Sequence, residues 1–326
     1  MTNGLSGPRK QFLDVLRVLA TCAVVLMHVL TGATDVTDAS IMPEYRSLLL
    51  SVMDLVTWCV PIFLLISGYL FLNPERTLTY PVMIKKYCRR IALAILLFGV
   101  PYAASELVVA ERTFRIRMIP EALKMTLTGH TWSHMWYLYL ILFLYLITPL
   151  LKKVLRVLPV WGVAAVMAVI FLGSSVAPFL NKVLDVNSIP VLPDGGVYFL
   201  YYLCGYFFAV REVGVDKGRN VWLTAAVAVL ALGMILSRTL AGFSIQMAYN
   251  YPFTVLLAVL LFAAGWNGSI KKHRIPWQEA GALSFAVYLV HPVYVNLLYK
   301  FVKITPFTVL EQCGVQSVAA GQAVLI

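Results

Sequence analysis

The chain has 326 residues, of which 60% are hydrophobic and only 13% are charged, and its mean hydropathy is +0.82. This apolar share lies far above that of an ordinary soluble domain and indicates a membrane protein. The net charge of +11 does not indicate nucleic-acid binding, because in a membrane protein an excess of Lys and Arg usually lies in cytoplasmic loops.

Apolar segments recur along the whole chain. A run of about 20 apolar residues is long enough to cross a bilayer as a helix. We expect ten such segments, at about 12–32, 47–72, 86–109, 134–155, 159–180, 196–212, 220–240, 249–266, 280–301 and 312–326. The sequence therefore predicts an all-α polytopic membrane protein with about ten transmembrane helices, in a single domain over residues 1–326.

The connections between these segments carry basic residues unevenly. When they are assigned alternately to the two sides of the membrane, the side of the N-terminus has sixteen Lys and Arg and the other side nine. Because cytoplasmic loops are enriched in basic residues, the imbalance predicts a cytoplasmic N-terminus. The long connection at about 110–133 is then expected to be an extracytoplasmic loop.

The first segment, FLDVLRVLATCAVVLMHVL, contains Asp14, Arg17 and His28. Ionisable groups inside a spanning helix cost at least a few kcal/mol each and normally face a protein interior or a wet cavity. Arg17 and His28 are eleven residues apart, so they share one helix face at about 16 Å along the axis. We expect a polar stripe there, with Asp14 paired to Arg17 at i, i+3. The alternative is a purely structural pair in which Arg17 extends to the membrane surface.

The second segment ends in PIFLLISGYLF, where Ser67 precedes Gly68. Small residues at this place can loosen the helix or admit another backbone closely, and a packing interface between helices is the favoured interpretation. In the third segment, Tyr102 follows Pro101, which lacks a backbone N–H and predicts a kink. Ser67 and Tyr102 are therefore candidates to line a site.

A basic cluster opens the third segment and consists of Lys85, Lys86, Arg89 and Arg90. One interpretation is the positive-inside signal together with contacts to anionic lipids. The other is a phosphate site for a cytosolic cofactor, because arginine matches the geometry of phosphate.

Four further residues are candidates for site lining. Glu106 and His134 lie near the outer surface, where ordinary hydration also accounts for them. His291 lies midway along its segment before Pro292, and Tyr288 is three residues earlier on a nearby face. An intramembrane histidine beside a proline is either a functional group or a hydrogen-bonded contact between helices.

The last segment ends at Ile326 while it is still apolar. We expect either a short helix or a helix that belongs to a longer chain with a fused C-terminal domain. The cysteines are scattered and show no metal-type spacing, so we expect neither a disulfide nor a metal site. They are Cys22, Cys59, Cys88, Cys204 and Cys313.

In this order the segments resemble the membrane acyltransferase-3 family. LDVLRVLATCAVVLMHV resembles the Arg-x10-His signature of the first helix of that family, and PIFLLISGYLF is similar to its second-helix pattern. The basic run that ends at Arg89–Arg90, followed by Pro101–Tyr102, resembles its third helix. Later parts of the family pattern are matched by HMWYLYLILFLYLITPLL, YFLYYLCGYFF and LSFAVYLVHPVY. The resemblance therefore covers nearly the whole chain.

The resemblance implies a ten-helix acyltransferase of the bacterial inner (cytoplasmic) membrane. Such an enzyme transfers an acyl group, commonly acetyl from acetyl-CoA or another acyl-CoA, to a hydroxyl of a cell-envelope glycan or of a peptidoglycan or lipid-linked precursor. The residues that the family requires map onto Arg17 and His28. No metal is implied, and some members carry a further C-terminal domain.

On this reading, Arg17 and the basic cluster would bind the phosphates of CoA at the cytoplasmic face. The pantetheine arm would follow the polar stripe to His28, which would act as general base or carry the acyl group transiently. A transporter or glycan exporter without acyl transfer is the alternative, because buried charges and kinked helices suit it as well. A membrane anchor for a further domain leaves the stripe unexplained.

Overall fold

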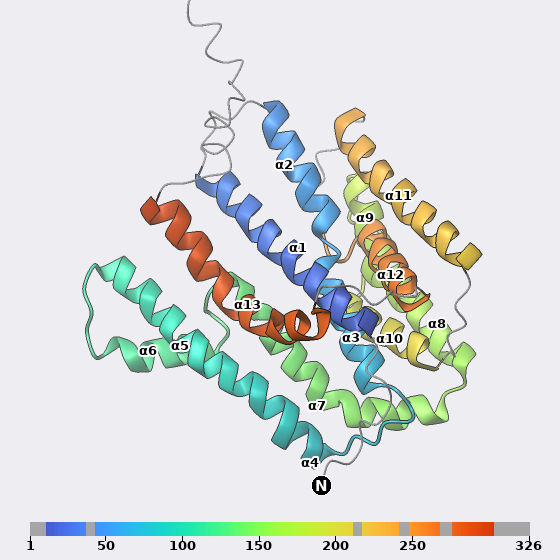
Figure 1. Ribbon diagram of the computed structural model, residues 1–326, viewed down its shortest axis with the longest axis horizontal. Coiled ribbons are helices and arrows are strands. Elements are labelled where there is room, and N and C mark those ends of the chain that lie inside the picture. The colour runs from blue at the N-terminus through green and yellow to red at the C-terminus, as the bar shows by residue number, and fades with distance from the viewer. Residues whose placement is uncertain (1–10, 37–42, 211–216, 241–247, 268–275, 303–326) are drawn as a thin grey trace, which may run out of the picture.

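The computed structural model describes residues 11–36, 43–210, 217–240, 248–267 and 276–302 (Figure 1). Within these residues the structure is helical, and no strand is present. The longer helices are α1 (Gln11–Val36), α2 (Pro43–Val56), α3 (Cys59–Phe71), α5 (Arg89–Glu111), α6 (Met118–Leu127), α7 (Trp136–Val157), α8 (Val160–Phe171), α10 (Gly195–Val210), α11 (Lys217–Leu240), α12 (Pro252–Asn267) and α13 (Trp277–Leu297). The short ones are α4 (Tyr80–Val82), η1 (Met83–Cys88), η2 (Ser133–Met135), η3 (Leu172–Val176), α9 (Ala177–Val183) and η4 (Leu298–Val302).

Six helical stretches of the described chain are long and apolar enough to cross a membrane. They are Gln11–Ala33, Leu49–Phe71, Tyr80–Glu111, Ser133–Val157, Val160–Val183 and Trp277–Leu297. Three shorter apolar helices are Gly195–Val210, Asn220–Ile235 and Pro252–Trp266. The all-α multi-pass fold is confirmed, whereas ten spans stay a prediction. The tenth expected segment and Cys313 lie outside the described residues.

The second expected segment is divided into α2 and α3 by a turn at Thr57 and Trp58. Pro61 has no backbone N–H, so the carbonyl of Thr57, four residues earlier, loses its helical partner. The hydroxyl of Thr57 donates to the carbonyl of Met53 at 3.0 Å and closes the last turn of α2. The break therefore follows from local chemistry that an apolar pattern does not reveal.

The connection expected at about 110–133 contains no membrane span, but it is not without regular structure, because it includes helix α6. Met118, Ala122 and Thr126 recur every four residues and are buried, so α6 has one apolar face. That face packs on α5 at Gly99, where an added Cβ would lie 2.7 Å from Cγ2 of Thr126. The helix has 10 residues, too few to span a bilayer, and it covers α5 instead (Figure 1).

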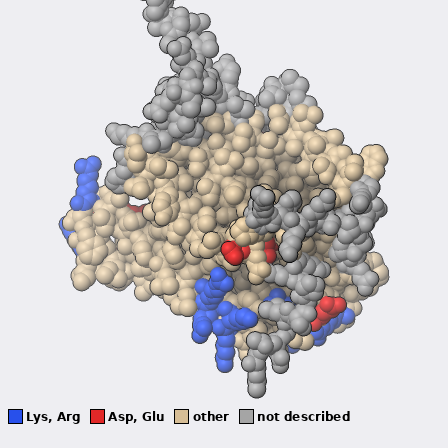
Figure 2. Space-filling view, in the orientation of Figure 1, with Lys and Arg blue, Asp and Glu red and all other residues tan. Residues whose placement is uncertain are grey.

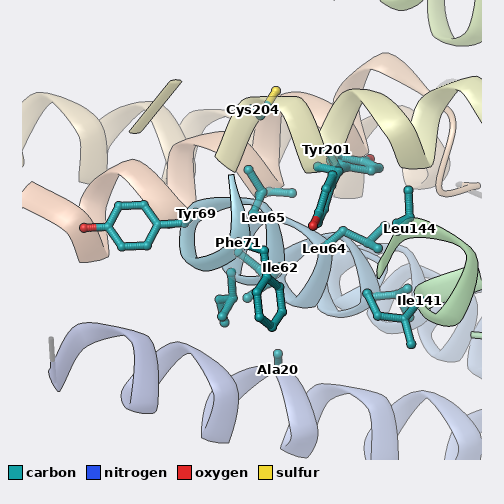
Figure 3. Packing of buried hydrophobic residues seen from close by; sticks show 14 of the residues in the cluster. Ala20, Ile62, Leu64, Leu65, Tyr69, Phe71, Ile141, Leu144, Tyr201 and Cys204 are labelled. Carbon is teal, nitrogen blue, oxygen red and sulfur yellow. The ribbon is translucent and has the colours of Figure 1, made fainter. Parts of the chain in front are cut away.

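Helix α3 is the centre of the bundle. Eleven of its thirteen residues are buried, as expected for a helix that is apolar on all sides. Figure 3 shows α3 between α1, which carries Ala20, and α10, which carries Tyr201 and Cys204. The backbones of α3 and α10 approach closely at Gly68 and Gly205, as small residues in membrane helices permit.

The contact at Gly68 gives a first testable prediction. A Cβ at this position would collide with the backbone oxygen of Tyr202, which no side-chain rotation relieves. We expect Gly68→Ala to lower the free energy of unfolding by about 1–3 kcal/mol or more. The control is Gly233→Ala in α11, where a Cβ meets nothing within 4 Å. Thermal unfolding in detergent measures both, and equal melting temperatures would contradict the prediction.

Helices α1 and α13 lie side by side although they are far apart in the sequence (Figure 1). Gly281, near the start of α13, faces Asp14 near the start of α1. The hydroxyl of Tyr299, just beyond α13, donates to the carbonyl of Val29 at 2.6 Å. The two helices therefore contact each other from their starts to their ends. Residues at equal distances from the two starts thus lie at similar depths in the bundle.

Candidate active site

A cavity of about 1150 Å³ lies between α1, α3, α5, α7 and α13. Its volume slightly exceeds the range of about 300–1,000 Å³ that is usual for small-molecule sites, so a large ligand fits. Its charged and polar lining consists of Asp14, Arg17, Ser67, Asn73, Glu75, Arg76, Arg90 and Ser284, together with Tyr69, Tyr87, Tyr137, Tyr145 and Tyr288. The cavity therefore gathers charge inside an otherwise apolar bundle.

Asp14 and Arg17 form the predicted ion pair at one end of this cavity. Nη1 of Arg17 donates to Oδ1 of Asp14 at 2.8 Å, and the Asp14 side chain is only 2% exposed. A buried carboxylate needs such a partner, because an unpaired charge in a dry environment is costly. The pair holds the guanidinium of Arg17 at the cavity wall.

Arg76 and Arg90 join Arg17 on the lining. Nη2 of Arg76 donates to the hydroxyl of Tyr87 at 2.6 Å, and Nη1 donates to the carbonyl of Leu70 at 3.1 Å. The guanidinium of Arg90 lies over the ring of Phe285, 5.1 Å from its centroid. Three guanidinium groups against the carboxylates of Asp14 and Glu75 suit an anionic ligand, phosphate above all. Arg76 was not among the predicted site residues, because it lies in the connection after α3, where no sequence pattern indicates which way a side chain points.

The structure separates Arg90 from the rest of the expected basic cluster. All four side chains are exposed, but Lys85, Lys86 and Arg89 line a shallow depression of about 490 Å³, whereas Arg90 contributes to the cavity lining. Successive residues of a helix point about 100° apart, so Arg89 and Arg90 face different surroundings. Figure 2 shows Lys and Arg side chains along the edge of the molecule where α4 and the start of α5 lie.

Three histidines from distant parts of the sequence meet beyond the other end of the cavity. The ring centroids of His28 and His291 are 4.7 Å apart, those of His134 and His291 5.8 Å, and those of His28 and His134 6.4 Å. His134 and His291 are each only 4% exposed. We call His28, His134 and His291 the histidine cluster. All three histidines were predicted site residues, but the sequence did not predict that they lie next to one another.

Backbone contacts fix the proton positions of two of these rings. Nδ1 of His28 lies 2.9 Å from the carbonyl of Val24, and Nδ1 of His291 lies 2.8 Å from that of Tyr288. A carbonyl oxygen only accepts, so Nδ1 carries the hydrogen in both rings. In the neutral imidazole, Nε2 is then a lone-pair acceptor that can act as a base.

Tyr288 separates the cavity from the histidine cluster. Its ring lines the cavity, and its hydroxyl donates to the backbone carbonyl of His134. Val24, whose carbonyl binds His28, also lines the cavity. The cavity thus runs from the ion pair of Arg17 to Tyr288 and Val24, directly beside His28.

Tyr102 and Trp132 pack against His134 of the histidine cluster. Their rings stack at 4.3 Å with an interplanar angle of 6°, and both contact the ring of His134. The hydroxyl of Tyr102 donates to the carbonyl of Leu289 at 2.6 Å. Glu106, the remaining candidate, is exposed and is not part of the cavity lining.

A multi-pass helical protein with an arginine-lined cavity and a group of histidines next to it has the features of a membrane-embedded enzyme. A family model described as an acyltransferase domain, that of the acyltransferase-3 family, matches residues 10–321. The match covers nearly the whole chain, so the chain belongs to the acyltransferase-3 family and is a membrane acyltransferase. No curated protein and no solved structure matches it.

Proposed function

We propose that the protein transfers an acyl group, in the first place acetyl, from cytosolic acyl-CoA to a hydroxyl of an extracytoplasmic acceptor in the bacterial cell envelope, a glycan or a peptidoglycan precursor. The observation that carries this proposal is the cavity from Arg17 to Tyr288. CoA combines a multiply phosphorylated nucleotide with a long, thin thiol arm. The cavity is lined by Arg17, Arg76 and Arg90, and it extends to Val24, whose carbonyl accepts the hydrogen bond of His28. Along α1, His28 lies about 16 Å from Arg17.

The direction of transfer follows from a cytoplasmic N-terminus. The starts of α1 and α5 and the end of α3 carry lining residues, among them Arg17, Arg90 and Phe71, and α7 contributes lining residues from its first half. Basic residues are enriched on the cytoplasmic side of membrane proteins. The nucleotide would therefore enter from the cytosol, and the acceptor would approach the histidine cluster from the opposite side.

The chemistry needs one base and one leaving group. Nε2 of His28 takes the proton of the acceptor hydroxyl while its oxygen attacks the thioester carbon. The carbon–sulfur bond breaks, the electron pair leaves with sulfur, and the thiolate takes the proton from His28. The products are an acyl ester and free CoA, so the imidazole is regenerated. Direct transfer requires no covalent acyl-histidine.

The proposal is tested with purified protein in phospholipid vesicles and acetyl-CoA labelled in the acetyl group. Release of free CoA together with transfer of label to an envelope glycan fraction is the expected result. Movement of glycan across the vesicle membrane without acetyl-CoA, and without any label transfer, would contradict the proposal and support a transporter.

The two neighbouring arginines of α5 provide a matched test of donor binding. Arg90 lines the cavity, whereas Arg89 faces the shallow outer depression. We expect Arg90→Gln to raise the KM for acetyl-CoA about tenfold or more, because charge-assisted hydrogen bonds contribute about 1.5–3 kcal/mol. Arg89→Gln should leave this KM within about twofold, as surface charges contribute little. Equal effects of the two substitutions would contradict the assignment of the cavity as the donor site.

A further inference from the structure

Lys152, near the end of α7, is a buried lysine with an unusual partner. It is only 5% exposed, whereas the side chain of its neighbour Lys153 is exposed. The ion pairs formed by the described residues do not include Lys152. A lysine is almost never fully buried unless it is paired, because an ammonium group in a dry environment is costly. This cost indicates a role that an apolar residue would not fill.

The partner of Lys152 is a backbone carbonyl in the connection after α3. Nζ of Lys152 donates to the carbonyl oxygen of Asn73. The backbone N–H of Arg76 donates to the same oxygen at 3.2 Å, and the N–H of Glu75 donates to Oδ1 of Asn73 at 2.9 Å. These bonds close a compact turn over residues 73–76, which we call the Asn73–Arg76 turn. Lys152 thus ties this turn to α7.

The Asn73–Arg76 turn forms part of the cavity wall. Asn73 and Arg76 line the cavity, whereas Lys152 is not part of the lining. Nη2 of Arg76 donates to the hydroxyl of Tyr87 at 2.6 Å, so the guanidinium is held at its outer end as well. Both ends of Arg76 are therefore fixed. A guanidinium that is already in place binds phosphate with a smaller loss of conformational freedom.

We propose that Lys152 is a positioning residue for the acyl-CoA donor, which anchors the Asn73–Arg76 turn to α7 and so holds the guanidinium of Arg76 at the cavity wall. This inference rests on the proposed function and adds to the donor site a residue that does not touch the donor. The alternative is a direct attraction between the charge of Lys152 and the donor phosphates. Such an attraction would not depend on Arg76, so the two roles are separable by experiment.

The test uses the full chain in phospholipid nanodiscs. It measures the Kd for CoA by equilibrium dialysis, and the KM and kcat for acetyl-CoA in the transfer assay. Lys152 is replaced by Met, which is apolar and of similar length, and by Arg, which keeps a charged donor. The Met substitution is also made in a chain that carries Arg76→Gln, so that the coupling of the two residues is measured. The matched control is Lys153→Met, because Lys153 is the exposed neighbour on the same helix.

Lys152→Met is expected to raise the Kd for CoA and the KM for acetyl-CoA about tenfold, with kcat within about twofold, because a displaced guanidinium binds phosphate less well. Lys152→Arg should recover part of this loss, and Lys153→Met should leave both constants within about twofold. In the Arg76→Gln chain, Lys152→Met should add less than about twofold. The melting temperature of Lys152→Met should not fall, because a buried ammonium without a carboxylate partner adds no net stability.

A Kd for CoA that stays within about twofold in Lys152→Met would overturn the inference. An increase of about tenfold that persists in the Arg76→Gln chain would also overturn it, since Lys152 would then act by its own charge. A lower melting temperature together with the higher Kd, and no recovery of either in Lys152→Arg, would show that Lys152 serves the fold alone.

The binding measurement keeps this inference distinct from the proposed function. A chain that binds CoA with the expected dependence on Lys152 and Arg76, yet transfers no label, would contradict the proposed function and support the inference. A chain that binds no CoA would contradict both.

Discussion

Replacement of His28 by alanine is expected to lower the rate of acyl transfer by about 10²–10⁴-fold, the usual contribution of a positioned general base. Nδ1 of His28 is held by the carbonyl of Val24, which lines the cavity, so Nε2 is the nitrogen left with a lone pair for the proposed reaction. The measurement is transfer of label from acetyl-CoA by equal amounts of purified protein. Binding of CoA should be unchanged, because His28 is not part of the cavity lining.

The matched control for this experiment is His130→Ala. His130 is exposed and precedes η2, and its Nδ1 lies 2.9 Å from the hydroxyl of Thr128. This variant should retain the full rate. A His28→Ala variant that transfers acyl groups within about tenfold of the unaltered chain would refute the role of His28 as base.

Replacement of Arg17 by methionine is expected to destabilise the protein by about 1–3 kcal/mol, because it removes one partner of a partly buried ion pair. The Asp14 side chain is only 2% exposed, and Arg17 lies 2.8 Å from it. Without the guanidinium, the carboxylate would remain buried beside Gly281 of α13. The measurement is the thermal unfolding midpoint in detergent.

A double variant separates the structural role of Arg17 from its role in donor binding. In Asp14→Asn with Arg17→Met the buried charge is gone, so most of the lost stability should return. The KM for acetyl-CoA should remain raised, because the cavity has lost one of its three arginines. Recovery of both stability and donor KM in the double variant would show that Arg17 serves the fold alone. An Arg17→Met variant as stable as the unaltered chain would show that the ion pair is not needed.

The sequence by itself determined the class of the protein and the local geometry of its first helix. Apolar runs identify the membrane helices, because every backbone polar group in a bilayer must be satisfied within the helix. The pairing of Asp14 with Arg17, and the placing of His28 on the same face, follow from the helical repeat alone. Both depend on residues of one helix, whose relative positions are set by local bonds.

Only the tertiary structure decided which side chains from different helices meet. Helix α3 approaches α10 at Gly68 and Gly205, and α13 approaches α1 at Gly281. These contacts set the rotation and depth of each helix, and no sequence periodicity specifies them. They direct Arg90 into the cavity and leave Arg89 outside.

The histidine cluster shows most clearly which features follow from the sequence and which from the packing of helices. More than a hundred residues of sequence separate His28 from His134, and again His134 from His291. Each of them, taken alone, could equally be a residue that only packs between helices. They meet because α13 packs along α1 and because the hydroxyl of Tyr288 binds the carbonyl of His134. The sequence thus determined that these polar groups lie within apolar segments, and side-chain packing between helices decided that they form one site.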